Sequence, residues 1–331
     1  PVPYTTLFRS GHHRVATRPI DTSIANMERW RWLPHELGNP YVMVNIPDFT
    51  LRVVKDGKTV WHTKIVVGKP NKRTPLISAS MKYITVNPTW NVPPSIIRNE
   101  YLPVLQQDPN ALDRIGLKME RNHDGTIRIF QPPGDRNALG RIRFNFPNKF
   151  LVYQHDTPDK YLFNKTSRAY SHGCMRVQDP LKYGEVLLSL IEPEKGYTQE
   201  RLRKMYGGSE ININFPHAIP VHLTYQTAYV DDAGKLVFRD DIYGYDSSIN
   251  AILHGDQRKI ASIPIERHDA SSSAPVMMPA DMAIGDRGGA SYSRSEPSFF
   301  ERLFGVSPEP APPARQFRQQ RRHTARQNDY D

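Results

Sequence analysis

The sequence of 331 residues contains a single cysteine, Cys174, which excludes an intrachain disulfide. It has no unbroken apolar run approaching the about 20 residues that a membrane-spanning helix requires. Its first residues lack the charged-then-apolar layout of a signal peptide. Residues 3–10, PYTTLFRS, read like the translation of a sequencing adapter, so we expect residues 1–10 to be artefactual and the chain to be truncated. The lack of a leader therefore says little about the compartment.

The net charge of +10 is spread along the chain. Neither an RNA-reading aromatic motif nor a zinc-finger spacing accompanies it, so we expect no nucleic-acid partner. An acidic polymer fits this charge as well.

Alternating apolar and polar residues predict a mainly β core that begins near Tyr41. YVMVNI, TLRVV and TVWHTKIVVG read as strands, and Asp56 and Gly57 supply a hairpin turn between the last two. Further strands are predicted at residues 82–87, 126–131, 141–146, 150–155 and 211–215, with a closing hairpin over residues 220–238.

A segment with helical character, residues 93–125, interrupts these strands. Ile97, Tyr101 and Leu105 recur at helical spacing, whereas Pro103 must kink or split the helix. Because the segment is inserted between strands, we expect either a lid over a site or a decoration at an edge. The lid interpretation requires a site nearby.

We expect the main domain to cover residues 38–250. The N-terminal segment, residues 1–37, ends in MERWRWLP, which predicts a short helix packed on the body. The tail, residues 251–331, lacks apolar periodicity and is expected to be largely disordered. Within it, FFERLFG begins at Phe299 and ends at Gly305, and its apolar spacing predicts a weak contact with a membrane or partner.

Two segments carry groups suited to nucleophilic catalysis: YSHGCMRV around Cys174 and VYQHDTP around His155. A cysteine nucleophile needs a base and donors for the oxyanion that forms on attack. Gly173 has no Cβ, so the N–H groups of Gly173 and Cys174 could share one concavity as an oxyanion hole. The alternative for a lone cysteine is a small buried hydrophobe.

Two histidines compete for the role of base. His155 ends a predicted strand and could reach the thiol across the fold. His172 lies two residues before Cys174, a spacing that rarely aligns imidazole and thiol, so we assign the base to His155 and the pocket wall to His172. Either could instead be structural. A zinc site of both histidines and Cys174 is a further interpretation, without a recognised zinc spacing.

These segments resemble the YkuD-type L,D-transpeptidases, in which a histidine precedes a Ser-His-Gly-Cys motif. MERWRWLP, VVGKPNKRTP, NPTWNVPPSI, NALGRIRFNFPN, HDTPDKYLF and FRDDIYGYD are similar to the long, YcbB-like branch, so the resemblance covers residues 27–246. It implies a catalytic β-sandwich with an inserted helical capping subdomain, which places the insert over the cleft.

The resemblance also implies the reaction. Cys174 would attack a peptidoglycan tetrapeptide stem at meso-diaminopimelate, release D-alanine and leave a thioester that an acceptor amine resolves. His155 would move the protons, and Tyr153, on the same strand face, would line the oxyanion pocket. This chemistry implies a periplasmic location and no cofactor or metal.

Three further residues complete the expected site. Ser171 belongs to the motif and is expected among the oxyanion and substrate contacts. Arg176 is expected to hold the active-site loop or a substrate carboxylate, with a surface salt bridge as the alternative. Trp90 is expected to be an aromatic wall for the stem peptide or a core residue.

The acceptor stays open: a second stem, an outer-membrane protein amine or a free D-amino acid. Water as acceptor would make the protein a carboxypeptidase or cross-link hydrolase of the same fold. A non-catalytic wall-binding module is the alternative from another class.

Overall fold

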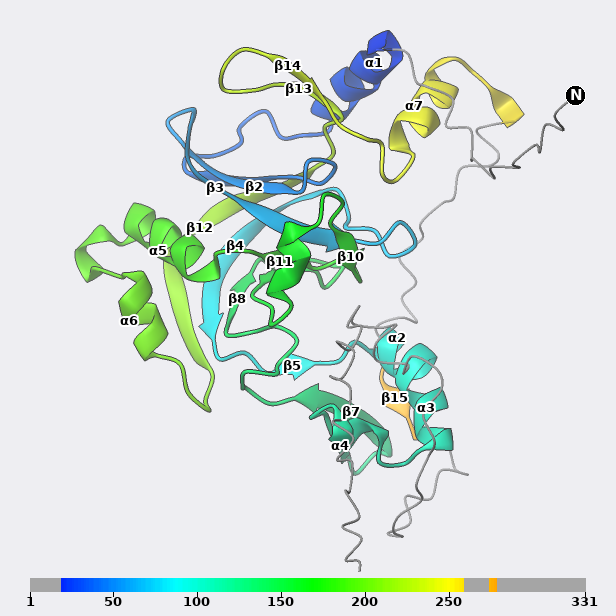
Figure 1. Ribbon diagram of the computed structural model, residues 1–331, viewed down its shortest axis with the longest axis vertical. Coiled ribbons are helices and arrows are strands. Elements are labelled where there is room, and N and C mark those ends of the chain that lie inside the picture. Colours follow the sequence, from blue (N-terminus) through cyan, green and yellow to red (C-terminus); the bar gives the residue numbers. More distant parts are fainter. Residues whose placement is uncertain (1–18, 259–273, 279–331) are drawn as a thin grey trace, which may run out of the picture. The chain divides into compact units, whose positions relative to one another are not determined.

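A nine-stranded sheet forms the body of the protein (Figure 1). The structure is a computed structural model that describes residues 19–258 and 274–278. The strands follow the order β10-β3-β11-β9-β8-β4-β12-β1-β2, and β3 also pairs with β2, so the path closes around one core. Their bounds are β1 (Tyr41–Asn45), β2 (Thr50–Lys55), β3 (Lys58–Gly68), β4 (Ile77–Val86), β8 (Ile142–Asn145), β9 (Gln154–His155), β10 (Ala169–Ser171), β11 (Met175–Val177) and β12 (Ile211–Thr224).

The hairpin predicted from Asp56 and Gly57 is confirmed. Both residues have positive φ, 51° and 71°, which matches the tight turn that the Asp-Gly pair favours. The alternation of the strands puts Leu51, Val53 and Ile65 in the core, all fully buried. The mainly β fold class follows from such strands.

Three strands differ from the prediction in length. The strand predicted at residues 82–87 begins five residues earlier, at Ile77, and the strand predicted at 211–215 continues as β12 to Thr224, with a register shift on the way. The strand predicted at 150–155 shrinks to β9, because Leu151 has a φ of 57° and cannot continue an extended chain.

Helix α5 (Pro180–Ile191) packs on the closed sheet, with α6 (Gln199–Lys204) beside it. Tyr183 and Leu187 of α5 are fully buried, as its predicted stripe requires. The Tyr183 ring stacks on Trp61 at 5.5 Å between centroids and lies 4.3 Å from Phe144. Each such buried side chain contributes about 1.5–3 kcal/mol, so this layer is a substantial part of the core.

The insert forms a cap with both helices and strands. The insert contains α2 (Pro94–Ile96), a π-helical turn (Ile97–Tyr101), α3 (Leu102–Gln107), α4 (Ala111–Arg114) and β6 (Lys118–Arg121). The flanking strands β5 (Trp90–Asn91) and β7 (Thr126–Gln131) complete the cap. The predicted apolar stripe is confirmed, since Ile97, Tyr101 and Leu105 are at most 5% exposed. The all-helical character predicted for residues 93–125 is wrong beyond Arg114, where β6 and β7 form a hairpin.

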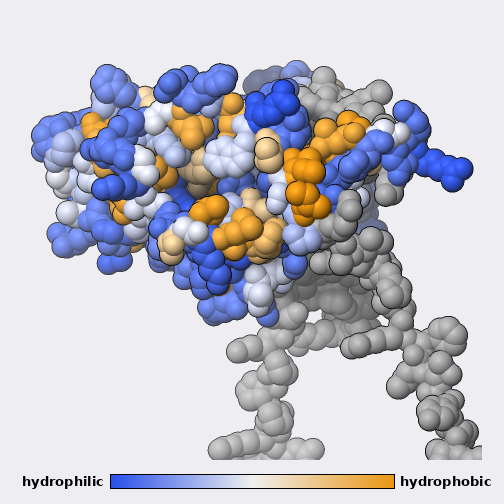
Figure 2. Space-filling view, turned by 90° about the horizontal axis from the view of Figure 1, so that it is seen from above, coloured by the Kyte–Doolittle hydropathy of each residue, from blue (hydrophilic) through white to orange (hydrophobic). Residues whose placement is uncertain are grey.

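The first described helix packs against a helix near the end of the continuous segment, residues 19–258. Helix α1 (Pro19–Trp30) contacts α7 (Tyr245–Leu253) and the hairpin of β13 (Ala228–Val230) and β14 (Leu236–Phe238). The helix therefore lies earlier than predicted, because only MERW, the first half of MERWRWLP, is helical. The predicted domain boundary at residue 250 falls inside α7. Exposed apolar side chains such as Met27, Val230 and Ile252 lie on these elements, and Figure 2 shows apolar groups among polar ones on the face seen from above.

Part of the predicted tail is ordered. Residues 274–278 include β15 (Val276–Met277), which pairs with β7 and adds a strand to the cap sheet. Residues 1–18 and the segment from Phe299 to Gly305 lie outside the described residues. Over the described ranges, no helix has both the length and the apolar content needed to cross a membrane.

Candidate active site

The register of two neighbouring strands brings the expected site together. Strands β9 and β11 run parallel, with Arg176 beside His155, and the Met175 N–H donates to Tyr153 O at 3.0 Å. Cys174 therefore lies beside Tyr153. Because side chains two positions apart share a face, Tyr153, His155, Cys174 and Arg176 all project from the same face.

The thiol of Cys174 is half-buried and lies among donors. Both the backbone N–H and the hydroxyl of Tyr153 donate to the sulfur, and the thiol faces Leu151 O at 4.0 Å. Burial raises the pKa of Cys174 to about 11, although the Tyr153 hydrogen bonds and then Arg143 and Arg176 act to lower it. At neutral pH the resting group is a thiol rather than a thiolate.

His155 is 5% exposed, and its Nδ1 lies 2.5 Å from Asp156 O. A carbonyl can only accept, so Nδ1 carries the proton and Nε2 keeps the free lone pair. Burial first, and then the positive charge of Arg176, lowers the pKa of His155 to about 3. The histidine is therefore neutral at pH 7, with the Nε2 lone pair unprotonated.

A tight turn before Cys174 is held by Ser171. Its hydroxyl donates to Cys174 O at 2.5 Å and accepts from the Gly173 N–H at 3.1 Å. Gly173 has a φ of 117°, a conformation that other residues rarely adopt. This arrangement differs from the expected oxyanion hole, because the Gly173 N–H already has an acceptor. Among the described residues, no acceptor is recorded for the Cys174 N–H.

Arg176 anchors the loop that follows β9. Its Nη1 bonds Asp159 Oδ2 at 2.8 Å, with the side chains only 10% and 16% exposed. Lys160 adds a second tie within this loop, to Asp156 Oδ1 at 2.6 Å. The surface salt bridge considered for Arg176 is thus wrong, since the pair is mostly buried.

The cap reaches the site through His172. Its Nε2 lies 3.6 Å from Glu100 Oε1, on the π-helical turn of the cap. Burial, followed by the charges of Lys69 and Lys72, lowers the pKa of His172 to about 4, and burial raises the pKa of Glu100. The contact is therefore not a full ion pair at pH 7. The cap thus lies close to the site, as the lid interpretation requires.

Trp90 provides a second tie between cap and site. It is 8% exposed, and its indole interacts with the Tyr153 hydroxyl, which in turn bonds the Cys174 sulfur. The Tyr153 ring also lies edge-on to His155, with 5.8 Å between centroids. Trp90 is thus buried like a core residue and yet contacts the site.

Sequence reasoning missed Arg143. This residue of β8 lies beside His155 in the register, and its guanidinium lies over the Tyr153 ring at 5.5 Å. Its Nε is buried without a partner among the described residues. The signal was the alternation of Arg141 and Arg143 in RIRFNF, which places both on one face of a strand.

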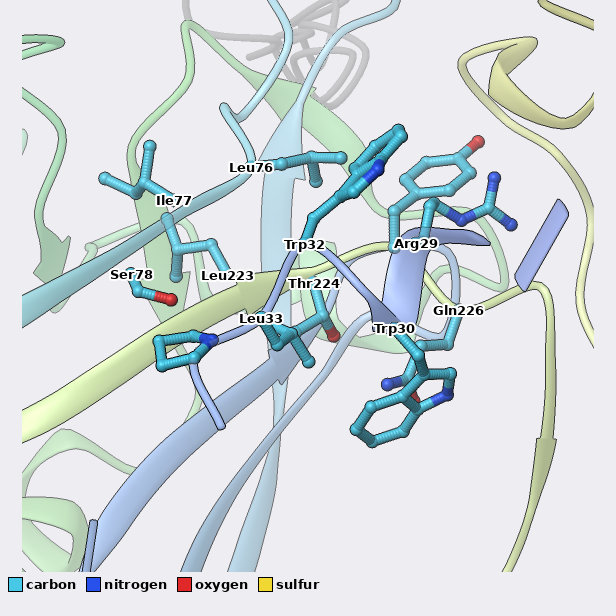
Figure 3. Close-up of a pocket in the computed structure, with 12 residues that line it drawn as sticks. Arg29, Trp30, Trp32, Leu33, Leu76, Ile77, Ser78, Leu223, Thr224 and Gln226 are labelled. Carbon is cyan, nitrogen blue, oxygen red and sulfur yellow. The ribbon is translucent and has the colours of Figure 1, made fainter. Parts of the chain in front are cut away.

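A pocket of about 230 Å³ lies elsewhere, beside the end of α1 (Figure 3). Trp30, Trp32, Leu76 and Leu223 line it, and none of the expected site residues does. Within residues 19–258 and 274–278, no group of three His, Cys, Asp or Glu residues could hold a metal, so the zinc interpretation lacks a ligand set.

Comparison with known proteins gives a consistent family. Residues 39–188 match the YkuD family, described as the L,D-transpeptidase catalytic domain. A Haemophilus influenzae protein provisionally named an L,D-transpeptidase is 32% identical over 242 residues, which cover 68% of this chain and 48% of that protein. The chain thus spans about half the length of this curated relative.

Solved structures of L,D-transpeptidases are also similar. The Enterococcus faecium catalytic domain is 16% identical, with 57% of this chain and 99% of that chain covered and a TM-score of 0.26. The Mycobacterium smegmatis enzyme is 13% identical, with coverages of 56% and 58% and a TM-score of 0.29. Both TM-scores lie below 0.5, so the assignment rests on the sequence matches.

Proposed function

Since residues 39–188 match the YkuD family of L,D-transpeptidase catalytic domains, we propose that this protein is a cysteine acyltransferase acting on peptidoglycan stem peptides. Cys174 is the nucleophile and His155 the base. The observation that carries this proposal is the β9–β11 register, which places both side chains on one face of neighbouring strands.

In the first half-reaction, the proton of Cys174 moves to Nε2 of His155 as the sulfur attacks the carbonyl carbon of meso-diaminopimelate. The oxyanion receives hydrogen bonds from the Cys174 N–H and from the Tyr153 hydroxyl, which gives up its resting bond to the sulfur as the negative charge moves to the oxygen. When the intermediate collapses, the bond to D-alanine breaks, and His155 returns the proton to its amine. A thioester on Cys174 remains.

In the second half-reaction, an acceptor amine attacks the thioester carbonyl. His155 takes a proton from this amine and delivers it to the leaving sulfur, which restores the thiol and completes a new amide bond. A neutral imidazole suits both steps because its Nε2 lone pair is unprotonated at pH 7 and can take the proton as the sulfur or the amine attacks. Arg176 and Arg143 stabilise the thiolate once it forms, through their positive charges.

The acceptor determines the biological outcome. A second stem would give a 3-3 cross-link, and an outer-membrane protein amine would tether that protein to the wall. Both outcomes place the protein in the periplasm. Water as acceptor would give a carboxypeptidase or cross-link hydrolase, so the product separates these candidates.

Intact mass spectrometry after incubation with tetrapeptide muropeptides tests the proposal. The wild type should gain the mass of the acyl group with release of D-alanine, and Cys174→Ala should gain nothing. His155→Gln should lose acylation, whereas the matched variant His62→Gln should retain it, since His62 is an exposed residue of β3 outside the site. A wild type that gains no adduct with either muropeptides or a carbapenem would support the non-catalytic module instead.

A further inference from the structure

A tyrosine beyond the family match connects to the turn that carries the nucleophile. Tyr243 lies between β14 and α7, outside residues 39–188, and is 4% exposed. Its hydroxyl donates to Gly68 O at 2.6 Å and accepts from the Thr74 N–H at 3.2 Å. Two ends of the loop after β3 are thus held by one side chain.

Thr74 passes this constraint to the active-site turn. Its hydroxyl accepts from the Gly68 N–H at 2.9 Å and donates to Gly173 O at 2.8 Å. Gly68, Thr74, Gly173 and Tyr243 are all buried. A Cβ added to Gly68 would lie 2.1 Å from Lys72 O, so the loop is closely packed. Little room remains for another arrangement.

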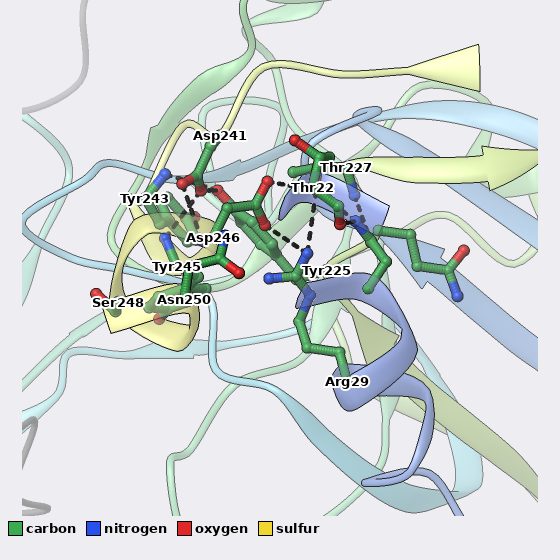
Figure 4. A network of polar contacts seen from close by, with 12 residues as sticks. Thr22, Arg29, Tyr225, Thr227, Asp241, Tyr243, Tyr245, Asp246, Ser248 and Asn250 are labelled. Carbon is green, nitrogen blue, oxygen red and sulfur yellow. Dashed lines mark hydrogen bonds and ion pairs between the residues drawn. The ribbon is translucent and has the colours of Figure 1, made fainter. Parts of the chain in front are cut away.

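Tyr243 is itself fixed by a network at the end of the domain (Figure 4). Its N–H donates to the Tyr225 hydroxyl at 2.7 Å, and this hydroxyl donates to Asp241 Oδ1 at 2.6 Å. Asp241 also accepts from two backbone N–H groups at the start of α7, including that of Asp246, which pairs with Arg29 of α1 at 2.5 Å. The relay therefore begins on a rigid, buried support.

We propose that Tyr243 is a positioning residue that acts through Thr74 to direct the Cys174 N–H toward the oxyanion. The carbonyl of Gly173 and the N–H of Cys174 belong to one planar trans peptide and point in opposite directions. A hydrogen bond that fixes Gly173 O therefore fixes the direction of this N–H. The inference rests on the proposed function, because it concerns an oxyanion donor of that reaction.

Substitutions can remove the hydroxyl groups of Tyr243 and Thr74 while keeping the packing of their side chains. The Tyr243 ring stacks on Tyr225 at 5.5 Å between centroids, a contact that phenylalanine keeps. Tyr243→Phe removes only the bonds to Gly68 and Thr74. Thr74→Val removes the hydroxyl with little change in volume, and Thr74→Ser restores it.

Two rates on Cys174 distinguish positioning from general damage. Acylation by the tetrapeptide or a carbapenem passes through an oxyanion, whereas alkylation by iodoacetamide displaces iodide and forms none. One oxyanion donor is worth about 100–1,000-fold in rate. We expect Thr74→Val to slow single-turnover acylation by about 10–100-fold and Tyr243→Phe by a smaller factor, with substrate KM and alkylation rate nearly unchanged.

Thr74→Ser should acylate close to the wild-type rate. Tyr229→Phe is the matched control, because the Tyr229 hydroxyl accepts from Arg239 at 3.2 Å and takes no part in the relay. Thermal melting checks that each variant folds. Equal losses of acylation and alkylation, or wild-type acylation in both Thr74→Val and Tyr243→Phe, would overturn the inference. A wild type without acylation would instead reject the proposed function.

Discussion

The resting thiol of Cys174 gives a quantitative prediction about its reactivity with pH. Burial raises its pKa to about 11, and the pKa of His155 is lowered to about 3, so proton transfer between them at rest is unfavourable. At pH 7 the thiolate fraction is about 10⁻⁴, from 10 raised to the power 7 minus 11. A free cysteine of pKa about 8.5 is about 3% thiolate, roughly 300-fold more.

Alkylation by iodoacetamide reports this fraction, because the thiolate is the reacting form. We expect the rate on Cys174 to rise about tenfold per pH unit from pH 6 to pH 10 with no plateau near neutrality. Intact mass after timed quenching measures it, and N-acetylcysteine under the same conditions supplies the reference. His155→Gln should leave the profile nearly unchanged, since the histidine holds no proton from the thiol at rest.

A plateau below pH 8 that disappears in His155→Gln would refute this reasoning. It would mean that thiolate and imidazolium form a stable ion pair before substrate arrives. The neutral pair instead requires that substrate binding and proton transfer coincide, so His155 acts as a general base during attack.

Three further outcomes concern stability, each measured by urea unfolding. Asp246→Ala should cost about 3–5 kcal/mol, because it leaves Arg29 as a buried charge without its partner, while Glu200→Gln at an exposed pair should cost under about 0.5 kcal/mol. Asp159→Ala should cost about 1–3 kcal/mol by leaving a mostly buried guanidinium without its acceptor. His155 becomes protonated below about pH 6.5 in the unfolded chain but stays neutral in the folded chain, so the free energy of unfolding falls as the pH falls. Between pH 7 and pH 5, His155→Gln should therefore lose about 2 kcal/mol less of this free energy than the wild type.

The body of the fold could be predicted from local patterns. Alternation identified the strands around the core, and Asp56 with Gly57 marked the first hairpin. The same signal was present at Asp124 and Gly125, with Gly125 at a φ of 81°, but the apolar helical spacing upstream led to a prediction of helix. Local signals therefore suffice when both the turn and its flanking strands are considered.

The site was predictable in its residues but not in its hydrogen bonds. Sequence spacing suggested Cys174 and His155 because their types and motif are distinctive. It could not show that Ser171 takes the Gly173 N–H, because that choice depends on the φ of Gly173 and the turn closing around it. Arg143 was equally hidden, since only the register between β8 and β9 places it beside the histidine.

Strand β15 ties the cap to a segment that lies far along the chain, because it pairs with β7 of the cap sheet. Val276 is 3% exposed against β7, Met278 donates to Gly125 O at 3.2 Å, and Arg98 donates to Ala274 O at 2.9 Å. If the cap opens, residues 274–278 must either move with it or break their contacts with it. Substitutions there could therefore tune how readily substrate enters without altering a single group that performs the chemistry.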